Sequence, residues 1–284
     1  MDEIGKVTLS TITLLGREIT FNPNMIIMTW VVMGILIALS FFAARGLKSV
    51  PGKLQNMFEI VIEFLDDITV STLGKKDGQK FLPLIATIFL FILLSNWIGI
   101  LPNICRIFGS FIALGHGLLG TPDAKIVFEG ITAINILSSP DNWYSFLFNV
   151  PPFEEPTKFV STCLALGILV FFVVHTYGIK NKGIVQYFKD YMDPVPAKAP
   201  YIYFFWLNPF FYLAVIGNLS NVVSHSFRLF GNIFGGGMII VIVSSLLKHV
   251  LIPVGLFAFF GLFAGLVQAF VFTMLSVTYI AQQR

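Results

Sequence analysis

The fold of this chain is decided by one long apolar run, residues 208–247, which reads NPFFYLAVIGNLSNVVSHSFRLFGNIFGGGMIIVIVSSLL. As a single helix this run would extend about 60 Å, whereas the hydrocarbon core of a bilayer is about 30 Å thick. The run therefore either breaks into two spans, with the polar residues 224–228 as the turn, or remains one helix that is strongly tilted in the membrane. Hydropathy alone does not separate these two alternatives.

The spacing of small and polar residues in this run favours the continuous helix. These residues recur at intervals of three and four, which places their side chains on one face of a helix. Such a face lets two helices, or a helix and a moving partner, approach closely within lipid. A static helix–helix contact is the alternative explanation. The members of this small-residue stripe are Gly217, Asn221, Ser224, Arg228, Gly231 and Gly235.

Arg228 is the one acidic or basic residue of the run, if histidine is counted as neutral. A charged side chain at the centre of a membrane span costs several kcal/mol, so it normally faces water or a carboxylate. The apolar spans of this chain contain no Asp or Glu that could pair with Arg228. We therefore expect its partner to be solvent or another chain. The alternative is an arginine whose long side chain reaches the interface from the end of a span.

The whole chain has the composition of an integral membrane protein. It is 56% hydrophobic and 12% charged, with a mean hydropathy of +0.84. Five stretches match or exceed the roughly 20 residues that a membrane-spanning helix needs. The sequence predicts an all-α protein with a tail at 1–23 and a single membrane domain at 24–284. The five predicted membrane-embedded segments are 24–44, 81–101, 159–179, 208–247 and 251–280, the last two forming a tilted helical hairpin.

A sixth helix is predicted at 57–73, on the surface of the membrane. Its apolar residues recur with helical spacing, and acidic residues occupy the remaining face. That pattern is typical of a helix that lies on a membrane or on a partner protein. The apolar set is Met57, Ile60, Val61, Phe64, Leu65 and Ile68, and the acidic set is Glu59, Glu63, Asp66 and Asp67.

The basic residues indicate an orientation rather than a nucleic-acid partner, since the net charge is only +3. Residues 45–80 hold six Lys or Arg and residues 180–200 hold four, whereas residues 103–157 hold two. Basic loops stay in the cytoplasm. The N-terminus and the 103–157 loop are therefore predicted to lie outside, and the C-terminal Arg284 inside.

Several motifs resemble subunit a of F-type ATP synthases. The central one is Ser226-Phe227-Arg228-Leu229-Phe230-Gly231-Asn232, followed downstream by Gln268-Ala269-Phe270-Val271-Phe272 and Tyr279. The likeness extends to Asn96 through Pro102 and to Ile179 through Ile184, and covers most of residues 24–284. It implies a bacterial plasma membrane protein without a cofactor, which works with the c-ring, the peripheral stalk subunit b and the lipid bilayer, and translocates H⁺ or Na⁺.

The resemblance also implies roles for individual residues. Arg228 matches the essential arginine that faces the c-ring and meets each rotor carboxylate in turn. The glycines at 217, 231 and 235 would allow close packing on that ring. Polar residues at matching positions would line the aqueous paths or hold the arginine: Ser220, Ser224, Asn232, Gln268 and Tyr279. Asn221 and His225 are polar but do not copy a universal family residue, and His225 suits packing or titration equally well.

Three glycines depart from the family pattern. Many proton-coupled relatives carry an acidic residue where this chain has Gly99 or Gly237, and a histidine or acid where it has Gly261. The motif at 156–161 likewise lacks the family's acid. A path with so few titratable groups would serve Na⁺ as well as H⁺, so the coupling ion stays open.

Two other classes of function are weaker. A stand-alone secondary ion transporter often has inverted repeats, and this sequence has no visible repeat. An intramembrane enzyme would need a nucleophile–base pair or a set of metal ligands. The four histidines and the two cysteines, Cys105 and Cys163, have no ligand spacing. The sequence therefore favours a translocator subunit that is not itself catalytic and holds no metal.

Overall fold

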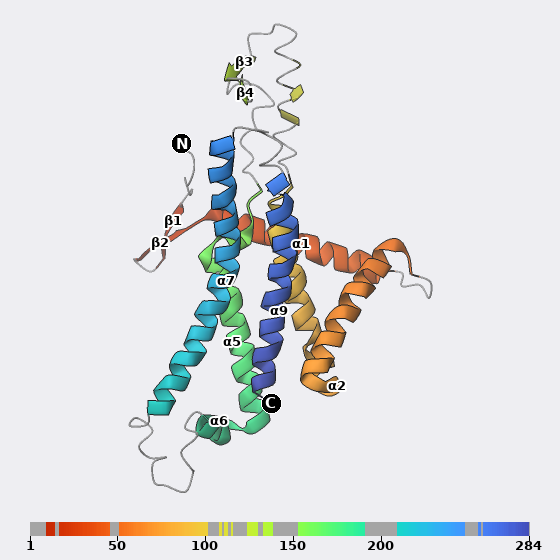
Figure 1. Cartoon of the computed structure of the whole chain (residues 1–284), viewed down its shortest axis with the longest axis vertical. Helices are drawn as coiled ribbons and strands as arrows, with labels where there is room; N and C mark the ends of the chain where they lie inside the picture. Colours follow the sequence, from red (N-terminus) through yellow and green to blue (C-terminus); the bar gives the residue numbers. More distant parts are fainter. Residues whose placement is uncertain are drawn as a thin grey trace.

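The structure is a computed structural model that describes residues 10–14, 17–45, 51–101, 153–190, 209–247 and 258–283, together with residues 255–256 and short pieces of 102–152. Five helices in these ranges are long and apolar enough to cross a membrane. Figure 1 shows an elongated bundle with the first of these helices lying across it. The five helices are α1 (Pro23–Ala44), α2 (Lys53–Ile98), α5 (Val160–Lys182), α7 (Pro209–Leu247), and a last helix in which the π-helical segment η3 (Phe259–Ala264) continues into α9 (Gly265–Gln282).

The prediction of an all-α membrane domain with five membrane-embedded segments is confirmed. The last segment was predicted to begin at 251, but residues 248–254 lie outside the described residues. Two short helices precede and follow α5: the 3-10 turn η1 (Pro156–Lys158) and α6 (Ile184–Asp190). The chain turns between α5 and α6 at Gly183, whose φ of 80° favours glycine.

Two small β-hairpins lie outside the helices and were not predicted. Strands β1 (Ser10–Leu14) and β2 (Arg17–Phe21) pair antiparallel within the predicted N-terminal tail. Strands β3 (Ala124–Glu129) and β4 (Ala133–Ser138) do the same within the loop that was predicted to lie outside the membrane. Neither hairpin joins the helical bundle, so the fold class is unchanged.

Helix α2 contains both the predicted surface helix and the second predicted span. The two parts are separated at Gly74, which has the positive φ of 75°. The chain reverses there, so α2 is a helical hairpin in Figure 1. Close to the turn, a Cβ built on Gly78 would lie 2.8 Å from the Cα of Val70. Glycine at 78 therefore lets the two arms meet.

The first arm of α2 packs on the bundle along fewer apolar residues than the sequence indicated. Leu65, Thr69 and Leu73 are buried. Met57 and Ile60, which belong to the predicted apolar face, are more than half exposed. The helix predicted at 57–73 is present, but only one edge of its apolar face enters the core.

The core of the bundle joins four of the five long helices. Helix α9 packs mainly on α2, and α7 packs mainly on α5. In contrast, α1 lies at the edge of the bundle, where Met28 and Val32 are its buried residues. The largest fully buried side chains include Ile85 and Ile92 on α2, Leu229 on α7, and Phe272 and Ile280 on α9.

The directions of α1 and α7 bear on the predicted tilt. As a helix of 22 residues, α1 is about 33 Å long and matches the bilayer core, whereas α7, with 39 residues, is nearly twice that length. In Figure 1, α1 runs across the bundle while α7 and α9 run along it. These helices cannot all stand perpendicular to the same bilayer. If α1 crosses the membrane directly, α7 and α9 are strongly tilted.

Candidate functional site

The candidate site is built on α7, which continues without a break through residues 224–228. The hydroxyl of Ser226 donates a hydrogen bond of 2.8 Å to the carbonyl of Val222, one helical turn earlier. This bond satisfies the hydroxyl inside the helix, as serine often does in apolar surroundings. The prediction of one continuous helix is confirmed, and the alternative of two spans with a turn at 224–228 is excluded.

One face of α7 packs into the bundle beside the arginine. His225, Ser226 and Leu229 are 3%, 0% and 0% exposed. A glycine on α5 makes room for this contact, because a Cβ built on Gly167 would overlap the hydroxyl of Ser226. Helices α5 and α7 therefore meet closely at the level of the arginine, which fixes the rotation of α7 about its axis.

The small-residue stripe lies on a different, exposed face of α7. A Cβ built on Gly217, Gly231 or Gly235 would meet no other atom within 4 Å. No described part of the chain covers these glycines, so no contact among the described residues explains them. Gly235 is half-buried, and the remaining stripe residues are exposed together with Ser220: Gly217, Asn221, Ser224, Arg228 and Gly231.

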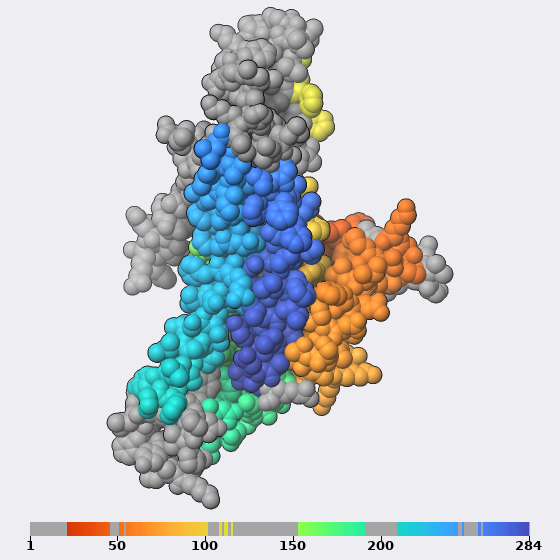
Figure 2. All heavy atoms as spheres, viewed as in Figure 1, coloured from red at the N-terminus to blue at the C-terminus, as the bar shows by residue number. Residues whose placement is uncertain are grey.

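A second exposed strip of α7 has the opposite character. Large apolar side chains recur along it at intervals of three to seven residues, as expected of a surface in contact with lipid tails. They are Ile216, Leu219, Val223, Phe227 and Phe234, each between 43% and 62% exposed. The uncovered surface of α7 thus divides into a bulky apolar strip and the small-residue stripe. Figure 2 shows α7 and α9 side by side on one face of the molecule.

Arg228 is exposed and makes neither an ion pair nor a hydrogen bond with another described residue. Within the described ranges, the single ion pair joins Lys182 and Asp190 at 2.9 Å, at the far end of α5. Among the described residues, no carboxylate pairs with Arg228. Its charge is therefore free to act on a neighbouring molecule.

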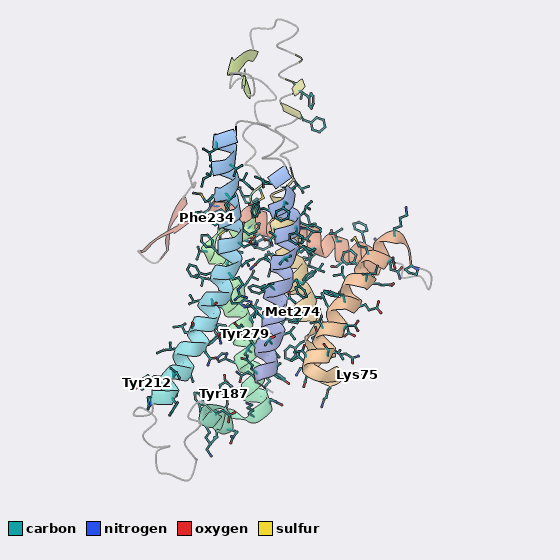
Figure 3. All side chains as sticks on the ribbon, in the orientation of Figure 1. Lys75, Tyr187, Tyr212, Phe234, Met274 and Tyr279 are labelled. Carbon is teal, nitrogen blue, oxygen red and sulfur yellow. The ribbon has the colours of Figure 1, made fainter. Side chains whose placement is uncertain are left out.

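The polar residues that were predicted to hold the arginine or line the aqueous paths also include Asn232 on α7, and Gln268 and Tyr279 on α9. The contacts of these three residues are with different parts of the bundle. The amide of Asn232 donates a hydrogen bond to the carbonyl of Ala264 at 3.4 Å. Gln268 is buried, and its Nε2 has no hydrogen-bond partner among the described residues. Tyr279 is half-buried, and its ring centroid lies 5.6 Å from that of His225. Figure 3 shows Tyr279 on α9, between the helices.

His225 faces the inside of the bundle rather than the stripe. Its ring centroid lies 3.8 Å from that of Phe272, and its Nε2 lies 3.5 Å from the hydroxyl of Ser276. Its Nδ1 is buried without a partner among the described residues. The histidine packs against α9, and both the packing and the titrating interpretation remain compatible with this position.

A polar junction that was not predicted ties α2, η1 and the last helix together. The amide nitrogen of Asn96 donates to the carbonyl of Gly265 at 3.0 Å, and the hydroxyl of Thr157 donates to Oδ1 of Asn96 at 2.7 Å. In addition, Trp97 Nε1 donates to the carbonyl of Leu262 at 3.2 Å. The wider turn of η3 changes the helical hydrogen-bond register, and side chains then bind carbonyls near it. The buried Asn96 stood in the quoted motif without an assigned role.

A large cavity lies beside this junction and is called here the outer cavity, because the sequence predicts that this end of α7 lies outside. Its volume is about 350 Å³, enough for several water molecules. Two of the three unusual glycines, Gly237 and Gly261, line it. The third, Gly99, contacts the carboxylate of the cavity-lining residue Glu155. Sequence reasoning missed Glu155, because nothing in one sequence indicates that a residue before η1 reaches the end of α2.

Comparison with known proteins bears directly on this arrangement. A family model described as "ATP synthase A chain" matches residues 26–281. The chain belongs to the ATP synthase A chain family. It is 32% identical over 253 residues to ATP synthase subunit a of Geotalea daltonii, covering 89% of this chain and 83% of that protein. It is 34% identical over 257 residues to ATP synthase subunit a of Desulfosudis oleivorans, covering 90% and 86%.

A more distant relative extends the match. ATP synthase subunit a of Bacillus velezensis is 28% identical over 288 residues, which covers 96% of this chain and 96% of that protein. The resemblance inferred from the motifs is thus confirmed over most of the chain. Family membership and the five apolar helices make the chain a multi-pass membrane component of the F0 sector.

Proposed function

We propose that this chain is the stator ion-channel subunit of a rotary F-type ATP synthase, and that its small-residue stripe faces the c-ring. It would supply two half-channels that carry H⁺ or Na⁺ to and from the ring carboxylates, and so couple ion flow to ATP synthesis elsewhere in the complex. The observation that carries the proposal is the uncovered stripe with the unpaired Arg228 at its middle.

Electrostatics explains what the arginine would do there. A fixed cation favours the ionised form of each ring carboxylate that passes, so the bound cation is released on arrival. The same charge repels cations that would otherwise leak directly between the half-channels. The small side chains around Arg228 would allow a ring helix to approach without collision. Ser220, Asn221 and Ser224 would offer polar contacts along that face.

Two hollows flank Arg228 along α7 and support the idea of two separate paths. The outer cavity is lined by residues that follow Arg228 on α7, including Asn232 and Gly237. A smaller pocket of about 30 Å³ is lined by residues that precede it, including Asn221 and His225, with Tyr279 on α9. In the order of residues along α7, one hollow lies before Arg228 and the other after it, as two half-channels separated by the arginine would require.

The proposed orientation puts Lys182 in the cytoplasm and residue 125 outside, in a bacterial plasma membrane with the N-terminus outside and the C-terminus inside. In a background without native cysteines, Lys182→Cys should be protected from an impermeant thiol reagent in intact cells, and Lys125→Cys should be labelled. The reverse labelling pattern would overturn this orientation. The peripheral stalk subunit b is a further proposed partner.

The alternative is a stand-alone secondary ion transporter, which would move ions without other subunits. We expect the purified chain alone in lipid vesicles to conduct neither H⁺ nor Na⁺ above the leak of empty vesicles. Conduction should appear when the chain is reassembled with its c-ring and stalk subunit, because the ring carboxylates complete the path. Gradient-driven ion uptake by the chain alone would favour the transporter and contradict the proposed function.

A further inference from the structure

At the end of α2, the space beside a glycine is filled by a side chain from the segment before η1. At Gly99 the helix has no side chain, and a Cβ built there would overlap the carboxyl group of Glu155. Glu155 precedes η1 and is 56 positions away in the sequence. A carboxylate therefore occupies the space that a side chain at 99 would otherwise take.

Hydrogen bonds around η1 hold Glu155 in this place. The carbonyl of Glu155 accepts a 3.0 Å bond from the backbone N–H of Lys158, which closes the turn. Thr157, two residues after Glu155, is fully buried and donates to Asn96 on α2. The thiol of Cys163 then donates to the carbonyl of Thr157 at 3.1 Å. These contacts anchor η1 to α2 and α5. They therefore fix the backbone that places the Glu155 side chain beside Gly99.

Glu155 also lines the outer cavity, where it is the one carboxylate among the described lining residues. Asn96 and Asn232 add polar side chains to the wall, and Lys158 adds a positive charge. The lining residues from α7 and η3 carry no titratable side chain, which includes Gly237 and Gly261. Among the described lining residues, an ion that entered this cavity would find a single acidic group.

The surroundings of Glu155 favour its protonated form. Burial raises the pKa of the Glu155 carboxyl above its ordinary value. A backbone hydrogen bond and the charge of Lys158 act in the opposite direction, and Glu154 acts in the same direction as burial. The carboxyl thus keeps a proton at a higher pH than a solvated glutamate does.

We propose that Glu155 is a proton relay of the outer cavity, which supplies from the segment before α5 the carboxylate that α2 lacks at Gly99. The carboxylate takes a proton from water at the rim of the cavity and returns it to water deeper inside, on the side of α7. One O–H bond forms and one breaks at each transfer. This inference rests on the proposed function.

The first test compares two neighbouring glutamates in the assembled complex. Glu155→Gln keeps the size and polarity of the side chain but removes its titration. We expect ATP synthesis driven by an imposed proton gradient to fall about tenfold, since water replaces a positioned proton-transfer group poorly. Glu154→Gln is the matched control and should lower the rate far less, because Glu154 only adjusts the pKa of the Glu155 carboxyl through its charge. The dependence of the rate on outer pH should also flatten in Glu155→Gln.

A second test moves the carboxylate back onto α2. Gly99→Asp alone should be impaired, because its side chain would collide with Glu155. Glu155→Ala alone should be impaired for lack of the carboxylate. The double variant Gly99→Asp/Glu155→Ala should regain most of the synthesis rate, since one carboxylate again occupies the same space. The double variant Gly99→Asn/Glu155→Ala fills the same space without an acid and should stay impaired, which separates a proton relay from a packing role.

The outcomes separate this inference from the proposed function. Normal synthesis by Glu155→Gln, with Arg228→Ala inactive, would overturn the relay and leave the channel subunit in place. Normal synthesis by both variants would overturn both. Synthesis that runs on a sodium gradient but not on a proton gradient would contradict the proton relay alone, as would a double variant that is no better than either single variant.

Discussion

Replacing Arg228 with alanine is expected to abolish ion-driven ATP synthesis while the complex still assembles. A nearby opposite charge favours an ionised carboxylate by a factor of roughly 10 to 1,000, and this factor is lost with the guanidinium. A rotor carboxylate would then pass the stator with its cation still bound, and the half-channels would no longer be kept apart. Assembly should survive because Arg228 is exposed and holds no other described residue.

Arg228→Lys should fail as well. Lysine keeps a positive charge but replaces the planar guanidinium with a compact ammonium, which loses its proton more readily when water is removed. A suitable control is Arg45, which lies at the end of α1 over the ring of Phe41. Arg45→Ala should leave synthesis near normal. If the side chain of Arg228 only extended to the membrane interface, its replacement by alanine would leave synthesis near normal, as expected for Arg45, and lysine would be tolerated.

Synthesis would be measured in reconstituted vesicles under an imposed ion gradient, with the subunit content determined on the same sample. An assembled Arg228→Ala enzyme that makes ATP at a near-normal rate would contradict the role assigned to this residue. Loss of synthesis together with loss of the c-ring from the complex would instead indicate a role in packing.

The course of α7 could be predicted from sequence because one periodic pattern governs it. Intervals of three and four residues predict that the stripe lies on one face of a helix, and the helix is continuous from Gly217 to Gly235. Arg228 could be found in the same way, since a lone charge in an apolar run has a clear energetic cost. The sequence could not tell whether the stripe faces the bundle. That depends on the contact of Gly167 with Ser226, which joins two helices distant in the chain.

Other parts depend on contacts that no local pattern contains. The helix at 57–73 was predicted from its own pattern of apolar and acidic residues, but the way it meets the bundle depends on the turn at Gly74. The junction of Asn96, Thr157 and Gly265 joins three separate elements. The sequence places Glu155 in a loop and gives it no distinguishing pattern. Its role in the cavity wall follows from its approach to Gly99, which is distant in the chain.

Two serines on α7 test most directly which face of the helix meets the rotor. Ser224 is exposed in the small-residue stripe, whereas Ser226, two positions later, is fully buried against Gly167. Single cysteines at these positions would be tested in a complex without other cysteines in this chain. The partner would be a cysteine beside the carboxylate on the rotor helix. The two positions share a sequence neighbourhood and differ in the face that they occupy.

The decisive measurement is oxidative cross-linking between each of these cysteines and the rotor cysteine in the assembled membrane complex. The structure predicts that Ser224→Cys forms a disulfide with the c-subunit and blocks ATP synthesis until it is reduced. Ser226→Cys should form none. A cross-link from position 226 with none from position 224 would contradict the claim that the small-residue stripe with Arg228 faces the rotor.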